Sequence, residues 1–139
     1  MSDLIETIPL AAEQFRQSAQ LDYSVDSLLA IDKYFDAHLS KFAPADKSNP
    51  VIEKEIQSQL LAIGAYLGET LKENMLGSNW ELDNSHPDEI VHAMLRLPDN
   101  TLVWPFQKAI KRFLNGFEDS LHGYAYLVTE SYYEKKKNK

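Results

Sequence analysis

The 139-residue sequence predicts a single α+β domain in which four or five helices surround a small antiparallel element of two or three strands, between residues 80 and 104. Apolar residues recur every three or four positions over most of the chain, which is the spacing of helices with one buried face. Between residues 80 and 104 this period is lost, and short alternating segments flank a proline-containing turn. The length favours one domain, expected over residues 1–134, followed by a basic flexible tail at 135–139 (KKKNK).

The first two predicted helices are defined by their start signals. Thr7 is a suitable N-cap with Pro9 in the first turn, which predicts a helix that runs to about residue 20. Ser24 is a suitable N-cap for a second helix that ends near residue 41, and residues 43–49 have the composition of a loop. The apolar face of the second helix comprises Leu28, Ile31, Phe35, Leu39 and Phe42.

The third helix has the longest periodic pattern in the chain. It is expected to start at Asn49-Pro50 and to be closed by Gly77. Gly64 and Gly68 lie beside the apolar stripe, where each costs up to about 1 kcal/mol relative to alanine. We therefore expect them to let a neighbouring helix approach closely. The stripe comprises Ile52, Ile56, Leu60, Ile63, Leu67 and Leu71.

The segment after Gly77 changes from helical to alternating spacing. Trp80-Glu81-Leu82 alternates, and residues 90–97 and 101–104 are expected to form strands joined by a turn at residues 98–100 (Pro-Asp-Asn). Pro105 then begins a helix that ends at Asn115-Gly116, and acidic residues at 118 and 119 favour the start of a last helix.

Composition limits the classes of function. The net charge of −7 disfavours nonspecific nucleic-acid binding, because phosphate backbones repel an acidic protein. The absence of cysteine excludes disulfides, thiol catalysis and zinc sites with cysteine ligands. The longest apolar-rich stretch, residues 60–67, is too short to span a membrane, and the first residues lack the features of a signal peptide. We expect a cytoplasmic protein without a membrane or nucleic-acid partner.

The sequence contains no recognisable catalytic, phosphate-binding or metal-binding motif. None of its serines lies in a nucleophile motif, and its glycines do not form a phosphate loop. The histidines are not spaced as in helical metal motifs, so no metal site, cofactor or catalytic residue is predicted. The sequence leaves open whether any of the four histidines is functional. They are His38, His86, His92 and His122.

One candidate ligand site is a crevice around Glu69, which follows directly after Gly68. Tyr66 and Trp80 would form its aromatic wall, with Lys108 and Arg112 across from the carboxylate, an arrangement that suits a polar ligand. The alternatives are that Glu69 and the basic residues lie on solvated helix faces, or that the basic residues form an internal ion pair with Glu69, Glu118 or Asp119.

A second candidate site is the acidic side of the helix after Ser24. Residues 1–40 carry seven acidic and two basic residues. Asp26, Asp32 and Asp36 lie on this helix, and Asp32 and Asp36 are one turn apart and should project together. An acidic face of this kind speeds association with a basic protein partner.

Three blocks of sequence carry a family resemblance: LDYSVDSL at 21–28, GAYLGETL at 64–71, and LPDNTLVWPFQKAIKRFLNGFEDSL at 97–121. In this order they resemble a family of small bacterial proteins catalogued as a domain of unknown function. The resemblance covers roughly residues 21–126. It implies a stand-alone bacterial cytosolic protein, and it lends no catalytic residues.

These observations lead to three hypotheses. The first is a non-enzymatic protein-binding module, such as an immunity-type inhibitor of a toxic enzyme. The alternative is a small-molecule-binding module or cryptic enzyme with the crevice around Glu69. The third is a homo-oligomer formed through Val103 and Trp104 on an edge strand, although the sequence leaves the oligomeric state open.

Overall fold

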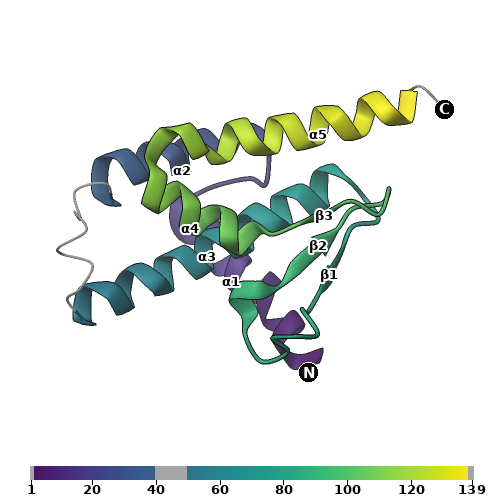
Figure 1. Cartoon of the computed structure of the whole chain (residues 1–139). Coiled ribbons are helices and arrows are strands. Elements are labelled where there is room, and N and C mark those ends of the chain that lie inside the picture. Colours follow the sequence, from purple (N-terminus) through teal and green to yellow (C-terminus); the bar gives the residue numbers. More distant parts are fainter. Residues whose placement is uncertain (1, 40–49, 138–139) are drawn as a thin grey trace.

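The computed structural model of the protein describes residues 2–39 and 50–137, and within them it forms the helical α+β domain that the sequence predicts (Figure 1). A three-stranded antiparallel sheet of order β1-β2-β3 accompanies five α-helices in these ranges. The helices are α1 (Ser2–Ala19), α2 (Leu28–Tyr34), α3 (Pro50–Asn74), α4 (Pro105–Asn115) and α5 (Leu121–Lys137), and the strands are β1 (Asn79–Glu81), β2 (Met94–Arg96) and β3 (Leu102–Val103).

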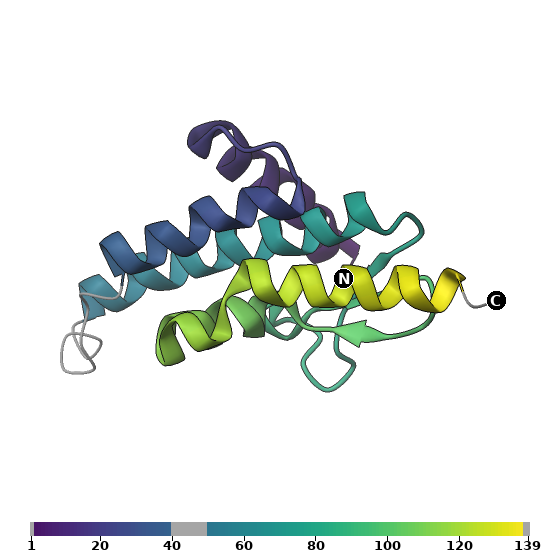
Figure 2. The same cartoon turned by 90° about the horizontal axis from the view of Figure 1, so that it is seen from above.

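Helix α3 runs through the middle of the molecule, with α1 and α4 packed against it and α5 lying alongside α2 (Figures 1 and 2). It begins at Pro50, as predicted, because a proline in the first turn needs no backbone donor. The core is built around its apolar stripe, of which the buried members are Ile56, Leu60, Ile63, Leu67 and Leu71. None of the described helices is long and apolar enough to cross a membrane.

The predicted start of the first helix is wrong. Helix α1 begins at Ser2 and passes through Pro9, and the Thr7 hydroxyl donates a hydrogen bond to the Leu4 carbonyl instead of capping the helix. Proline inside a helix removes one backbone hydrogen bond. The helix continues because Ile8 and Ala12, on either side of Pro9, are fully buried against the core.

The second helix starts as predicted but is less regular than expected. The Ser24 hydroxyl accepts a hydrogen bond from the Ser27 amide and caps a 3₁₀ turn, η1 (Val25–Ser27), which leads into α2. After α2 the backbone continues as a π-helical turn, η2 (Phe35–Leu39). The predicted helix end near residue 41 and the predicted loop at 43–49 lie outside the described residues.

The sheet is shorter than predicted. The first residues of the strand expected over 90–97 form a 3₁₀ turn instead, η4 (Ile90–His92). Only the β2 part of that segment pairs with β1 and β3. In this register, Leu95 lies opposite Trp80 of β1 and opposite Val103 of β3. The turn at 98–100 forms as predicted, with Asn100 in the left-handed region (φ 73°) and its amide donating to the Leu97 carbonyl. Val103, expected on an exposed edge, is buried, whereas Trp104 is exposed.

The predicted close approach of a neighbouring helix is confirmed at Gly64, whereas at Gly68 the closest contact is with the sheet. A Cβ atom on Gly64 would lie 2.9 Å from the Cα atom of Phe106 in α4, and a Cβ atom on Gly68 would overlap the indole ring of Trp80. The nearest neighbour at Gly64 is therefore helix α4, whereas at Gly68 it is a side chain of the sheet, with Pro105 of α4 next at 3.3 Å. These contacts explain why the longest helix keeps two residues of poor helix propensity.

The C-terminal part of the chain follows the predicted order. Helix α4 starts at Pro105 and ends at Asn115, and the C-cap residue that follows is Gly116, whose φ of 80° suits glycine. Helix α5 continues through Lys137, so the first three residues of the segment expected to be a flexible tail are helical, and residues 138–139 lie outside the described part of the chain.

The two packing environments of glycine generate a stability prediction. Gly68→Ala should lower the free energy of unfolding by about 2 kcal/mol or more, because the indole ring of Trp80 must move to admit the methyl group. Gly123→Ala in α5 is the matched control, since its Cβ would make ordinary contacts with Ser120. It should stabilise the protein by up to about 1 kcal/mol. Urea denaturation of both variants provides the measurement, and equal effects would contradict this account of Gly68.

Candidate functional site

The residues predicted for the crevice around Glu69 are only partly brought together. The Glu69 carboxylate accepts a hydrogen bond of 2.7 Å from Trp80 Nε1, so these two residues do meet. Tyr66 is fully buried, and its hydroxyl accepts a hydrogen bond from the Tyr23 amide and shares another with Ser27. Through these hydrogen bonds Tyr66 holds the segment before α2 against α3, and its side chain has no exposed surface that could contact a ligand.

The two basic residues of the predicted crevice are engaged by other carboxylates. Lys108 Nζ lies 2.9 Å from Asp119 Oδ1, which confirms the internal ion pair that was one of the alternatives. Arg112 is 1% exposed and donates to Asp32 and Asp36 of the second helical segment. The structure thus does not gather the five predicted residues around one ligand.

Asp32 is the most constrained of the predicted partner-binding residues. It is 2% exposed, so its expected position on an acidic surface is wrong. Oδ1 accepts from Arg112 Nε (2.8 Å) and the Leu121 amide (3.0 Å), and Oδ2 accepts from the Ser120 hydroxyl (2.8 Å) and the His122 amide (3.0 Å). The carboxylate therefore caps the start of α5 and neutralises a buried arginine.

Burial and hydrogen bonding act on the Asp32 carboxyl in opposite directions. Desolvation raises its pKa, whereas the hydrogen bonds from Arg112, from the amides of His122 and Leu121 and from Ser120 lower it. The hydrogen bonds prevail, and the pKa of Asp32 lies below its ordinary value. Asp32 is therefore ionised in the folded protein at neutral pH.

Asp26 and Asp36 remain at the surface. The side chain of Asp26 is 88% exposed and lies 3.2 Å from His122 Nε2, and that of Asp36 is 55% exposed and accepts from Arg112 Nη2. Exposed Leu29 and Lys33 lie between them in the sequence. Successive spacings of three or four residues place these four side chains along one side of the helical segment. We call Asp26, Leu29, Lys33 and Asp36 the α2 ridge.

An apolar hollow of 540 Å³ lies beside α2, where the helix meets α1 and α3. Its lining includes Phe15 and Leu21 from the first part of the chain, Ile31 and Tyr34 from α2, and Ala62 from α3. Tyr34 is 36% exposed, and its hydroxyl donates to Gln59. An aromatic residue at the edge of an apolar hollow is a typical contact in protein interfaces.

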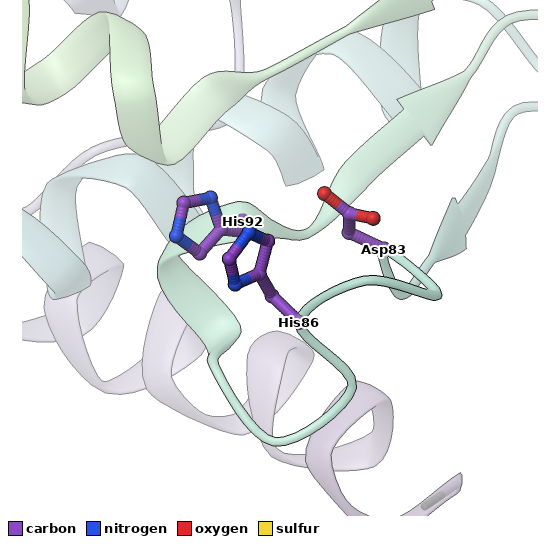
Figure 3. Close-up of side chains that lie close together, drawn as sticks. All are labelled: Asp83, His86 and His92. Atoms are coloured by element: carbon purple, nitrogen blue, oxygen red, sulfur yellow. The ribbon is translucent and has the colours of Figure 1, made fainter.

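A second cluster, which the sequence did not predict, lies in the connection between β1 and β2. Figure 3 shows Asp83, His86 and His92 close together there. Each offers one ligand atom, and these atoms all lie within 4.8 Å of one another. The two imidazole rings stack with their centroids 4.1 Å apart. Carboxylate and imidazole are ligands of zinc and of several other transition metals, so these residues have the chemistry of a metal site.

Backbone hydrogen bonds fold the connection that carries this cluster. The Asp83 carboxylate accepts from the Ser85 amide, the His86 amide donates to the Asp83 carbonyl, and the Glu89 amide donates to the His86 carbonyl. Helical spacing does not predict this cluster, because its histidines lie six residues apart in a connection made of turns, and His92 ends the 3₁₀ turn η4. The available signal was composition, since residues 83–92 contain five aspartate, glutamate and histidine residues.

Comparison with known proteins assigns no family to the chain. No protein-family model, no curated protein and no solved structure matches it. The resemblance to a bacterial family of unknown function therefore stays a prediction.

The environment of Asp32 predicts a large effect of its substitution. Asp32→Asn should lower the free energy of unfolding by about 3 kcal/mol or more, because it leaves the buried guanidinium of Arg112 without its main counter-charge. Asp36→Asn is the matched control: its side chain is 55% exposed, and its loss should cost less than about 1 kcal/mol. Chemical denaturation distinguishes the two, and similar losses would contradict a dominant role for Asp32.

The same carboxyl predicts a dependence of stability on pH. Because the pKa of Asp32 is lowered in the folded state, its contribution is present above the unfolded pKa of about 3.9 and is lost as the pH falls through the folded value. Between pH 5 and pH 2 the free energy of unfolding should therefore fall more steeply for the wild type than for Asp32→Asn. Denaturation curves at each pH measure both slopes, and equal slopes would refute the contribution.

Proposed function

We propose that the protein is a non-enzymatic binding protein of the bacterial cytoplasm that recognises a basic protein partner, in the manner of an immunity-type inhibitor of a toxic enzyme. The observation that carries the proposal is the combination of the α2 ridge, with its exposed carboxylates, and the adjoining apolar hollow. Charge at the edge of an interface and an apolar centre are the two components of a specific protein contact.

The electrostatic part of the proposal rests on the distribution of charge along the chain. Residues 1–40 carry five more negative than positive charges, within a total of −7, and four of this excess remain when the buried Asp32, which Arg112 neutralises, is left out. Helix α2 and the lysine-rich end of α5 lie toward opposite ends of the molecule (Figures 1 and 2). A polarised acidic protein of this kind attracts and orients a basic partner before contact, and the attraction weakens as salt shortens its range.

The apolar part of the proposal rests on Leu29 and Tyr34. Leu29 is 44% exposed in the middle of the α2 ridge, and Tyr34 lies at the hollow. Covering them would remove apolar surface from water while the hydroxyl of Tyr34 keeps its partner Gln59. These two residues would therefore slow dissociation, whereas the carboxylates would speed association.

Lys33 allows the sign of the electrostatic effect to be tested in both directions, because it is a positive charge within the α2 ridge. A partner is first captured from the native cytosol at low salt and purified. The Asp26→Lys variant should then associate with this partner severalfold more slowly than the wild type, and the Lys33→Glu variant should associate faster. Both effects should shrink as salt rises. Stopped-flow or surface-plasmon measurement of association rates at several salt concentrations provides the readout.

Charge-matched variants on α5 control for net charge. Glu130→Lys changes the net charge as Asp26→Lys does, and Lys135→Glu changes it as Lys33→Glu does, but both residues lie on α5. Their association rates should stay near that of the wild type. If the α5 variants change the rate as much as the ridge variants do, or if Lys33→Glu slows association, the α2 ridge is not the interface.

A further inference from the structure

We infer that Asp83, His86 and His92 form a binding site for one divalent transition-metal ion, with Zn²⁺ the best match to the ligands. Three potential ligand atoms of two chemical types meet within 4.8 Å (Figure 3). This inference is independent of the proposed partner interface, because the three residues lie between β1 and β2 and not on α2.

The three residues come from the two ends and the middle of one short connection. Asp83 follows β1 by two residues, His92 closes the turn η4 just before β2, and His86 lies between them. The hydrogen bonds of Ser85, His86 and Glu89 described above fold this connection back on itself. The ligands are therefore assembled by the backbone before any ion binds, which reduces the ordering that binding requires.

The distances are compatible with zinc after a small closure. Zinc binds imidazole nitrogen and carboxylate oxygen at about 2.0–2.2 Å, which places two ligand atoms of a tetrahedral site about 3.4 Å apart. The present upper limit of 4.8 Å requires the side chains to close by about 1.4 Å. His86 and His92 have side chains that are 44% and 34% exposed, so rotation of the rings meets little packing resistance.

Glu89 is placed to support the histidines from outside the cluster. Its Oε2 atom lies 3.1 Å from His92 Nε2 and 3.6 Å from His86 Nδ1. Histidines that bind metal commonly donate the other ring N–H to a carboxylate, which fixes the orientation of the ring. We assign this positioning role to Glu89. The three remaining residues then leave one coordination position open to water or to a ligand, as in zinc sites with three protein ligands.

The inference is tested by isothermal titration of the full chain with ZnCl₂ in a buffer that does not chelate the ion. One ion should bind per chain with a dissociation constant on the order of 10 µM, weaker than four-ligand structural sites. At about 100-fold excess over this constant, zinc should raise the unfolding temperature by roughly 9 °C. Intense visible absorption on addition of Co²⁺ would indicate four-coordination instead of six-coordination.

Variants within and outside the cluster decide whether the ion binds at this place. His86→Ala and His92→Ala should each weaken binding at least about 100-fold and abolish the thermal shift, and Glu89→Gln should weaken binding about tenfold. His38→Ala and His122→Ala are matched controls, because these histidines lie on other elements, and they should bind zinc as the wild type does. Circular dichroism of each variant establishes that the fold is intact.

Two outcomes would overturn the inference. One is the absence of binding to the wild type at 1 mM Zn²⁺. The other is wild-type affinity in the His86 and His92 variants, or an equal loss in the His38 and His122 controls, which would place the ion elsewhere or make it nonspecific. If Glu89→Gln alone binds like the wild type, the positioning role of Glu89 fails while the site itself stands.

Discussion

The buried carboxylate of Asp32 is the constraint on which the arrangement of the helices depends. It joins α2 to α4 through Arg112 and to the start of α5 through two backbone amides and the Ser120 hydroxyl. The guanidinium of Arg112 also lies 4.9 Å from the ring of Phe35, which places the cation within the core. An unpaired charge at this depth is costly, so the three helices are held in the one arrangement in which all these groups meet.

The sequence predicts those parts of the fold that local spacing controls. The stripe of α3, the Ser24 cap, the turn at 98–100 and the start of α4 at Pro105 each depend on residues close together in the chain. The errors at Pro9 and at 90–92 have the opposite origin. Burial of Ile8 and Ala12 in the core stabilises α1 as a helix on both sides of Pro9. Residues 90–92 form a 3₁₀ turn although their β propensity alone predicts a strand.

The candidate sites were harder to predict than the fold, because the sequence does not indicate which charged side chains are buried. Arg112 and Asp32 are 80 residues apart, and nothing in either local sequence distinguishes them from the exposed charges on the same helices. The sequence therefore placed Asp32 on an acidic surface and left Arg112 open between a ligand crevice, a solvated helix face and an internal ion pair with other carboxylates. The histidine cluster was missed for a related reason: its spacing follows from the turns of one irregular connection, and no helical or strand period describes it.

The two candidate sites differ in how many of their residues also stabilise the fold. A substitution tests function cleanly only where the residue does not stabilise the fold. Asp36 belongs both to the α2 ridge and to the surroundings of Arg112, so a change there alters binding and also, to a much smaller extent than at Asp32, the stability of the fold. Asp26 is 88% exposed and its charge can be reversed with little effect on the core. Likewise, His86 and His92 project from the connection between β1 and β2 and not from the buried cluster around α3. Loss of metal binding on their removal would therefore be attributable to the ligands themselves.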